Sequence, residues 1–416
     1  MTQSPGRHGV QVRTESPAAM LDESVFYEDI NCLHARATSE TSINISHITS
    51  QNYTAMPPDD LPAYIDFRPA NVSKADVCYL QSKGCFSFPE RDVVDDLLRC
   101  YFDYLHPRVP FLDEQEFWET YLARNRDTPC SDHSDNRHGI SLLLFQAVLF
   151  AAATCASPSL LRRAGYRSRS VAHGDAFSKV RALYAFDVEQ DKMIQLQTLL
   201  LMSFWRGDLN EDKDAWHWSG LAVTMASDLF LYRAPSAQLT ERQKTLRNRC
   251  WWSCVLRDRL LALRERRDPR LLLDESDVPM LTLADYNLGL RCPLSEMSAE
   301  AELGKRTALS MFSIQLIRLV LCISDASPSQ PPSLTSSSPA ASQIWDRTPV
   351  APPTDGSTTG LPDLDLWRLN LPEVLQLTHD STRDHNMLPC VLVHRTSLQI
   401  YYQYGFYPHP IHRSRL

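Results

Sequence analysis

The segment from Ile140 to Ala156 is apolar on nearly every face of a helix, and it constrains the fold more than any other stretch. Three polar side chains interrupt it, at Ser141, Gln146 and Thr154. A helix that is hydrophobic all round lies in the core of a large protein or in a membrane. This stretch falls short of the roughly 20 apolar residues that span a bilayer. We therefore predict a central helix that other helices cover on several sides.

Further segments repeat apolar residues at helical spacing. Asp113 and Asp214 stand where the next helices need an N-cap. No segment shows the alternation with period two that a half-buried strand requires. The pattern predicts an all-α fold with helices over residues 89–105, 114–121, 140–156, 172–186, 192–205, 215–232, 241–263 and 299–323, and helical character near 364 and across 388–404.

Composition divides the chain into four parts. Residues 1–88 are polar and rich in Ser, Thr and Pro, which predicts a mostly disordered N-terminal region. Residues 89–323 form the large multi-helix domain. Residues 324–360 are so rich in Pro and Ser that we expect a flexible insertion or linker. Residues 361–416 form a C-terminal helical portion.

Charge and cysteine usage limit the classes of function. The formal net charge is −8, which argues against a dedicated DNA-binding domain, because nucleic-acid affinity comes mainly from basic residues. The 11 cysteines include no CxxC pair, and no apolar signal segment opens the chain. We expect free thiols in a soluble intracellular protein without a membrane segment.

Catalytic and metal motifs are missing or weak. The sequence holds no Walker A loop, GxGxxG, HExxH, EF-hand or GxSxG motif, so we predict no enzyme and no catalytic residues. Cys250 and Cys254 share a helix face, but two thiols facing the core explain them better than zinc. His173 beside Asp175 is best explained by a helix start that Asp175 caps. We therefore expect no metal and no cofactor in this chain.

Two groups of residues are candidates for contacts with other molecules. Arginines cluster at residues 162–169 and 257–270, and interleaved acids partly neutralise the second cluster. For both clusters we expect ion pairing within the protein, with phosphate contact or nuclear import as the alternative. If a ligand pocket exists, the aromatic side chains that we expect to line it are Trp216, Trp218, Trp251 and Trp252. A place in the hydrophobic core is the alternative explanation for these tryptophans.

Three segments resemble a known family. They are Tyr101 to Asp113 (YFDYLHPRVPFLD), Trp216 to Asp228 (WHWSGLAVTMASD), and Arg247 to Arg259 (RNRCWWSCVLRDR) followed by DVPML at 277–281. Their order and spacing are similar to the fungal-specific transcription factor domain, the helical middle homology region of zinc-cluster regulators. The third segment looks most like the activators of cutinase and secondary-metabolism genes. The resemblance covers about residues 90–323, and more weakly 361–404.

The resemblance implies a nuclear transcription regulator of a catabolic or secondary-metabolite gene set. It also implies a homodimer or a heterodimer with a related regulator, and a small-molecule effector. Full-length members carry a six-cysteine zinc cluster, whereas residues 1–90 hold only Cys32, Cys78 and Cys85. Direct contact with promoter DNA is thus expected only if a missing cluster exists, and we expect a truncated gene model or a shortened regulator. The alternative is a ligand-sensing or heterodimerisation module that binds no DNA. The sequence also departs from the family pattern after the third segment, where Arg264 stands at a position that is usually Gly.

Overall fold

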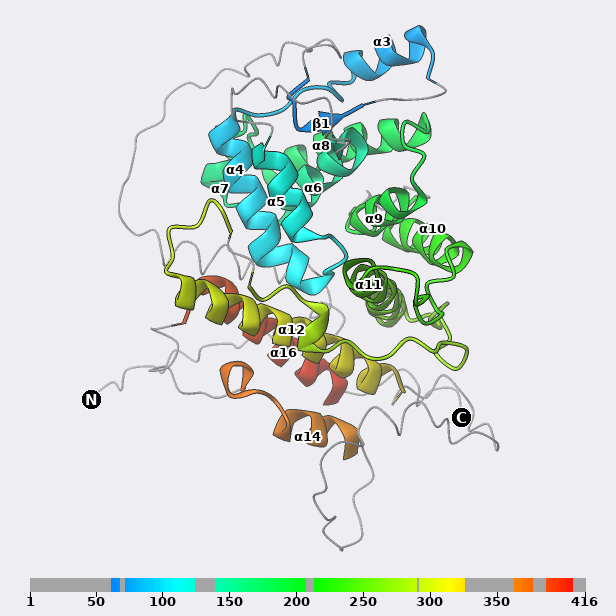
Figure 1. The fold of residues 1–416 in the computed structure, drawn as a ribbon, viewed down its shortest axis with the longest axis vertical. Helices are drawn as coiled ribbons and strands as arrows, with labels where there is room; N and C mark the ends of the chain where they lie inside the picture. Colours follow the sequence, from blue (N-terminus) through cyan, green and yellow to red (C-terminus); the bar gives the residue numbers. More distant parts are fainter. Residues whose placement is uncertain are drawn as a thin grey trace, which may run out of the picture.

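The computed structural model describes residues 61–67, 72–123, 139–206, 213–289, 292–325, 362–376 and 387–406. Within these ranges the chain folds into packed helices with one sheet of two very short strands (Figure 1). The predicted all-α class is confirmed. Most of the expected Pro/Ser-rich linker and the first 60 residues lie outside the described ranges.

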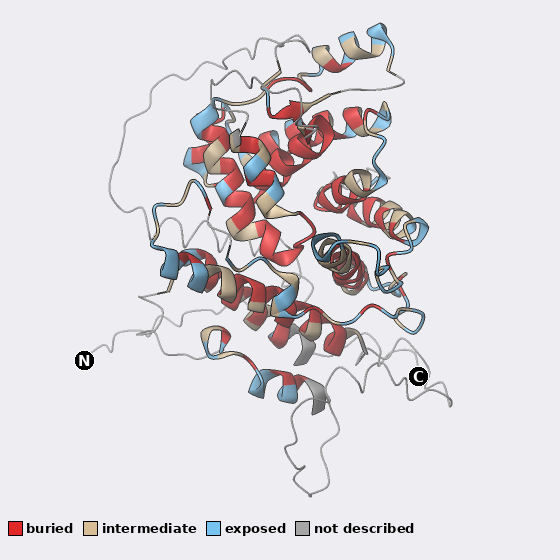
Figure 2. Ribbon diagram, viewed as in Figure 1, coloured by how far each residue is buried: buried red, intermediate tan, exposed pale blue. Residues whose placement is uncertain are grey.

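The central helix is α6 (Leu142–Cys155), and every one of its residues is buried. It packs against α4 (Arg91–Cys100), α8 (Arg169–Ala185) and α9 (Lys192–Met202). The polar interruption Gln146 donates hydrogen bonds to the carbonyl oxygens of Cys85 at 2.8 Å and Ser87 at 3.3 Å. Burial of this amide is tolerated because it has partners. The prediction of a central helix covered on several sides is therefore confirmed (Figure 2).

The remaining helices form two further groups around this centre. On one side α9 packs against α10 (Ala215–Asp228), which in turn packs against α11 (Glu241–Glu265). Below them α12 (Ala299–Asp325) lies beside α16 (Pro389–Phe406) and contacts α14 (Pro362–Leu369) (Figure 1). The smaller elements are α5 (Glu114–Ala123), α7 (Pro158–Arg163), η4 (Leu283–Asp285) and η5 (Glu373–Leu375).

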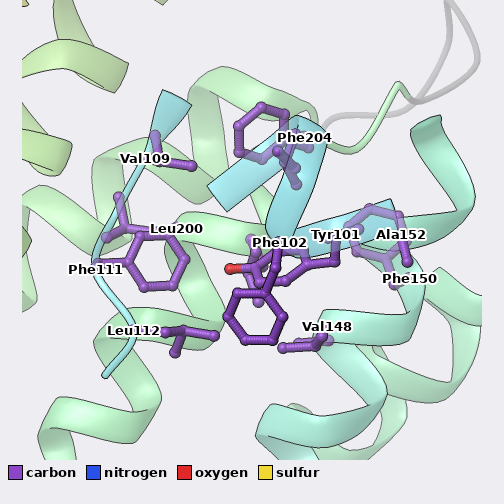
Figure 3. Packing of buried hydrophobic residues seen from close by; sticks show 14 of the residues in the cluster. Tyr101, Phe102, Val109, Phe111, Leu112, Val148, Phe150, Ala152, Leu200 and Phe204 are labelled. Carbon is purple, nitrogen blue, oxygen red and sulfur yellow. The ribbon is translucent and has the colours of Figure 1, made fainter. Parts of the chain in front are cut away.

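The first helix of the domain changes its winding instead of ending where we expected. After α4 the chain continues as a π-helix, η2 (Tyr101–Leu105), and a 3-10 helix, η3 (His106–Arg108). Pro107 lacks a backbone N–H and cannot continue an α-helical ladder. Figure 3 shows Tyr101 and Phe102 among buried side chains from α6, α9 and the segment after η3. Short π segments are frequent at functional sites, and this one lines the cavity described below.

The packed structure begins before residue 89. Helix α3 (Lys74–Ser82) carries a complete capping box on Ser73, and it is followed by the buried residues Cys85 and Phe86. Strand β1 (Ile65–Asp66) pairs in parallel with β2 (Ile140–Ser141). A Cβ at Gly139 would lie 2.9 Å from backbone atoms of β1, so the approach of the two strands requires glycine. The expectation of a mostly disordered N-terminal region does not hold for residues 61–67 and 72–88.

Two helix ends also differ from the sequence pattern. Helix α10 ends at Asp228, because Phe230 adopts a left-handed conformation with φ 52°. Helix α8 begins at Arg169 with Ser168 as its N-cap, so Asp175 lies inside the helix and caps nothing. Among the described helices, α12 is long and apolar enough to cross a membrane, but 72% of its apolar window is buried against the rest of the protein.

Candidate functional site

A cavity of about 310 Å³ lies where the π-helix, α5, α11 and α12 meet. Its walls come from η2 and η3, from the N-terminal turns of α5 and α11, from η4 and from α12. The lining residues with ionisable side chains are Asp103, His106, Asp113, Glu114, Glu241, Arg242, Arg249, Asp285, Tyr286, Lys305 and Arg306. A volume of this size is at the lower end of the range for small-molecule sites.

The cavity has a buried floor and an exposed rim. Phe102, His106 and Arg249 are buried, whereas the rim residues Arg242 and Asn287 are exposed. Apolar surface comes mainly from aromatic, proline and aliphatic side chains. A concave site with apolar walls and a few placed polar groups is the usual form of a small-molecule site.

Three ion pairs hold the walls together. Arg306 donates to both carboxylate oxygens of Glu114, at 2.7 and 3.0 Å. Lys305 Nζ lies 2.7 Å from Asp103 Oδ1. Arg242, on the rim, donates to both oxygens of Asp113, with 2.7 Å between Nη2 and Oδ1.

The pKa values of these carboxyls show that the pairing outweighs burial at two of them. Burial would raise the pKa of Glu114, but the hydrogen bonds and the charge of Arg306 lower it overall. Burial likewise opposes the ionisation of Asp113, and its hydrogen bonds from Arg242 and the backbone lower the pKa overall. Both carboxylates therefore stay ionised, which suits binding better than proton transfer.

Arg249 differs from the other three cations of the cavity. It is 8% exposed, and no carboxylate of the described residues lies within ion-pair distance of it. Its Nη1 atom donates to the carbonyl oxygen of Leu112 at 3.1 Å, and its Nε atom has no hydrogen-bond partner. The neighbouring His106 also contacts the Leu112 carbonyl, at 3.3 Å. Burial lowers the pKa of His106 to about 4, so this ring is neutral and adds no second positive charge beside Arg249.

The tryptophans proposed for a ligand pocket do not line this cavity. Trp218, Trp251 and Trp252 are buried in the hydrophobic core, and the Trp252 indole donates to the carbonyl of Pro279 at 2.8 Å. Trp216 is half-buried, and the Arg270 guanidinium lies over its ring, 3.4 Å from the centroid. Three of the four rings therefore lie in the hydrophobic core, and a role of these tryptophans in ligand binding stays a prediction.

The other sequence candidates have structural partners. Cys250 is buried and contacts the carbonyl oxygen of Phe111 at 3.5 Å. His173 stacks between the rings of Phe150 and Trp205. No group of three or more His, Cys, Asp or Glu side chains that could hold a metal ion occurs in the part of the chain that the structure describes.

The arginine clusters form ion pairs, but partly with partners that the sequence did not indicate. Arg163 contacts Asp92 and Asp96 of α4, at 2.7 Å each. Asp258 of α11 pairs with Arg270, which lies beyond the end of that helix, at 3.3 Å. Long-range packing, and not spacing along one helix, therefore sets these contacts.

The cavity residues were missed as a site although two of the three recognised segments contain them. Phe102, Asp103 and His106 belong to the first segment, and Arg249 belongs to the third. The available signal was a single arginine, Arg249, directly before the apolar run Cys250 to Trp252. Nothing in one sequence indicates that these two segments meet.

The described helices thus form a packed, mainly helical body with a partly charged cavity. Comparison with known proteins identifies its class: the fungal specific transcription factor domain matches residues 98–345, more than half of the chain. The chain belongs to this family of fungal specific transcription factor domains, as the three segments suggested. No solved structure matches it.

Curated relatives are transcription factors by name. Cutinase transcription factor 1 beta of Fusarium vanettenii is 35% identical over 287 residues, which are 67% of this chain and 31% of that protein. Transcription factor cpaR of Aspergillus oryzae is 30% identical over 334 residues, 76% of this chain and 52% of that protein. Fusaric acid cluster transcription factor FUB12 of Fusarium oxysporum is 27% identical over 321 residues, 74% and 41% respectively. The chain thus spans between about a third and a half of these relatives.

Proposed function

We propose that the protein is a nuclear transcription regulator that controls a catabolic or secondary-metabolite gene set through its helical domain. The observation that carries the proposal is the family match over residues 98–345, supported by relatives that are named for cutinase and fusaric acid cluster regulation. The cavity supports a further part of the proposal, in which a small effector binds the helical domain and changes the activity of the regulator. Regulation without catalysis agrees with a site in which arginines keep the carboxylates of Asp113 and Glu114 ionised.

The regulatory role is testable with the full chain fused to a heterologous DNA-binding domain. Expression of a reporter under the matching operator should rise or fall by several-fold relative to the DNA-binding domain alone. A fusion in which the core residue Trp251 is replaced by Asp should lose the effect, because burying a charge unfolds the body. An intact fusion that leaves the reporter unchanged under all growth conditions tested would contradict the proposal.

A second candidate function is a heterodimerisation or sensing module that binds no DNA itself. The net charge of −8 favours it, because nucleic-acid affinity comes mainly from basic residues. DNA binding of the purified chain, measured against salt concentration together with its zinc content, separates the two candidates. Sequence-selective binding with bound zinc would reject the module. Co-purification with a related zinc-cluster regulator, without DNA affinity of the chain alone, would favour it.

A further inference from the structure

Arg249 is a buried cation that forms no ion pair with any described carboxylate, although its charge contributes to the lowered pKa of Asp113. Its guanidinium lines the cavity floor, and its single hydrogen bond to the described residues goes to a neutral carbonyl, that of Leu112. The side chain is more than nine-tenths buried, and Nε has no partner at all. Buried charges in proteins are paired, since an isolated one is costly, and an unsatisfied buried group calls for an explanation.

The other cations of the cavity, unlike Arg249, have partners of opposite charge. Arg242, Lys305 and Arg306 reach the same cavity, and each is paired with an acid at a distance of less than 3 Å. Glu241 is paired as well, with Lys244 at 2.7 Å. Asp285, also in the lining, accepts hydrogen bonds from Thr282 and Asn248 instead of pairing with a cation. Among the described residues, Arg249 is thus the one cation of the cavity that forms no ion pair.

We propose that the cavity binds a small organic molecule bearing one carboxylate, and that the carboxylate pairs with Arg249. Arginine is the usual residue for a buried carboxylate because its guanidinium is always charged and presents several donors. This inference rests on the proposed function, since it names the chemical class of the effector. It stands on the geometry of the cavity and not on the identity of the target genes.

The other lining residues limit which kinds of molecule fit the rest of the cavity. Phe102, Pro107 and Leu309 give the cavity apolar surface that suits the hydrocarbon part of such a molecule. A second negative charge would meet Asp113 and Glu114, whose own cations are already engaged. The cavity therefore favours a monocarboxylate with an apolar body over a dicarboxylate or inorganic phosphate.

The test measures the thermal unfolding midpoint of the full 416-residue chain with increasing sodium benzoate, at constant ionic strength. Sodium decanoate is a second probe with a longer apolar part, and benzamide, succinate and inorganic phosphate are compared with them. A ligand that binds the folded state raises the midpoint in a concentration-dependent way. We expect a rise with at least one monocarboxylate that exceeds the rises with benzamide, succinate and phosphate.

Variants assign the binding to the cavity floor. Arg249→Met should weaken binding of the monocarboxylate by at least about tenfold, because it removes the countercharge. Arg247→Met is the matched control: it lies on the same helix and also donates to a backbone carbonyl, that of Leu229 at 2.7 Å, but does not line the cavity. If Arg249→Met fails to fold, Thr245→Tyr fills the cavity from one turn away on α11 and should block binding while the fold is kept.

The outcomes are decisive in both directions. Binding of a monocarboxylate that Arg247→Met keeps and that Arg249→Met or Thr245→Tyr loses supports the site. The absence of a shift with both monocarboxylates, an equal shift with benzamide, or a phosphate shift that needs Arg249 overturns it. The reporter fusion is read separately. Arg249-dependent binding with an unresponsive reporter would remove the regulatory role and keep the site, whereas an active reporter without binding would do the reverse.

Discussion

The Glu114–Arg306 pair gives the sharpest test of how this fold is held together. The two side chains are only 15% and 11% exposed, and they join the first turn of α5 to α12. Removing one partner of a buried pair costs about 3–5 kcal/mol when the other charge is left alone. The structure predicts that the two possible removals are unequal, because Arg306 also lies 3.3 Å from Glu302.

Arg306→Met should be the costlier change. It leaves the carboxylates of Glu114 and Glu302 without their shared cation, and Glu302 is 1% exposed. We expect a loss of about 3–5 kcal/mol in the free energy of unfolding. Glu114→Gln keeps Arg306 close to Glu302, and glutamine can still accept the hydrogen bond from Trp118. We expect that change to cost about 1–3 kcal/mol. The double variant should cost at least about 1 kcal/mol less than the sum, since it leaves fewer unpaired charges.

The measurement is urea unfolding of each variant, followed by circular dichroism and by tryptophan fluorescence. The free energies are comparable if the two transitions coincide. Arg163→Met is a matched control, because Arg163 also bridges two carboxylates, Asp92 and Asp96, but is 47% exposed. Its loss should cost no more than about 1 kcal/mol. A cost for Arg163→Met equal to that for Arg306→Met, or a larger cost for Glu114→Gln than for Arg306→Met, would refute the argument from burial.

Three further predictions follow from single features. Gly139→Ala should lower the free energy of unfolding by roughly 1–3 kcal/mol and expose the first strand to proteolysis, because the new methyl group would meet backbone atoms at 2.9 Å. The control Gly174→Ala has open space around it inside α8, and it should be neutral or stabilising when both variants are compared by thermal unfolding. Arg266→Gly should raise the unfolding free energy by about 1 kcal/mol, since Arg266 ends α11 in a left-handed conformation with φ 55°, and an unchanged value would reject this source of strain. Burial lowers the pKa of His106 to about 4 and that of His394 to about 3, so the unfolded chain takes up protons first as the pH falls. Stability should therefore drop between about pH 6.5 and about pH 4 by roughly 1.4 kcal/mol per pH unit for each histidine, and His394→Gln should reduce that slope.

The sequence alone predicted most of the helices and the family. Helix signals act within one or two turns, so they can be read from a single sequence. Examples are the unbroken apolar surface of α6 and the N-caps Asp113 and Asp214. Helices α3 and α7, which it missed, carry local N-caps at Ser73 and Ser157 but are short, and their place in the fold depends on distant partners. Strand β1 needs Gly139, and α3 is anchored by the buried Leu80. The family segments were recognisable because the order of their residues and the spacing between segments can be read directly from the sequence.

The cavity is formed by the tertiary structure and could not be predicted from the sequence. Phe102 and Arg249 are far apart in the chain, and they reach one floor only because a π-helix and α11 meet beside α12. The same packing buries Trp251 in the core and places the Arg270 guanidinium over the Trp216 ring, so neither ring lines this cavity. Helix formation follows from short-range spacing, whereas the pairing or isolation of a charge depends on which helices pack together.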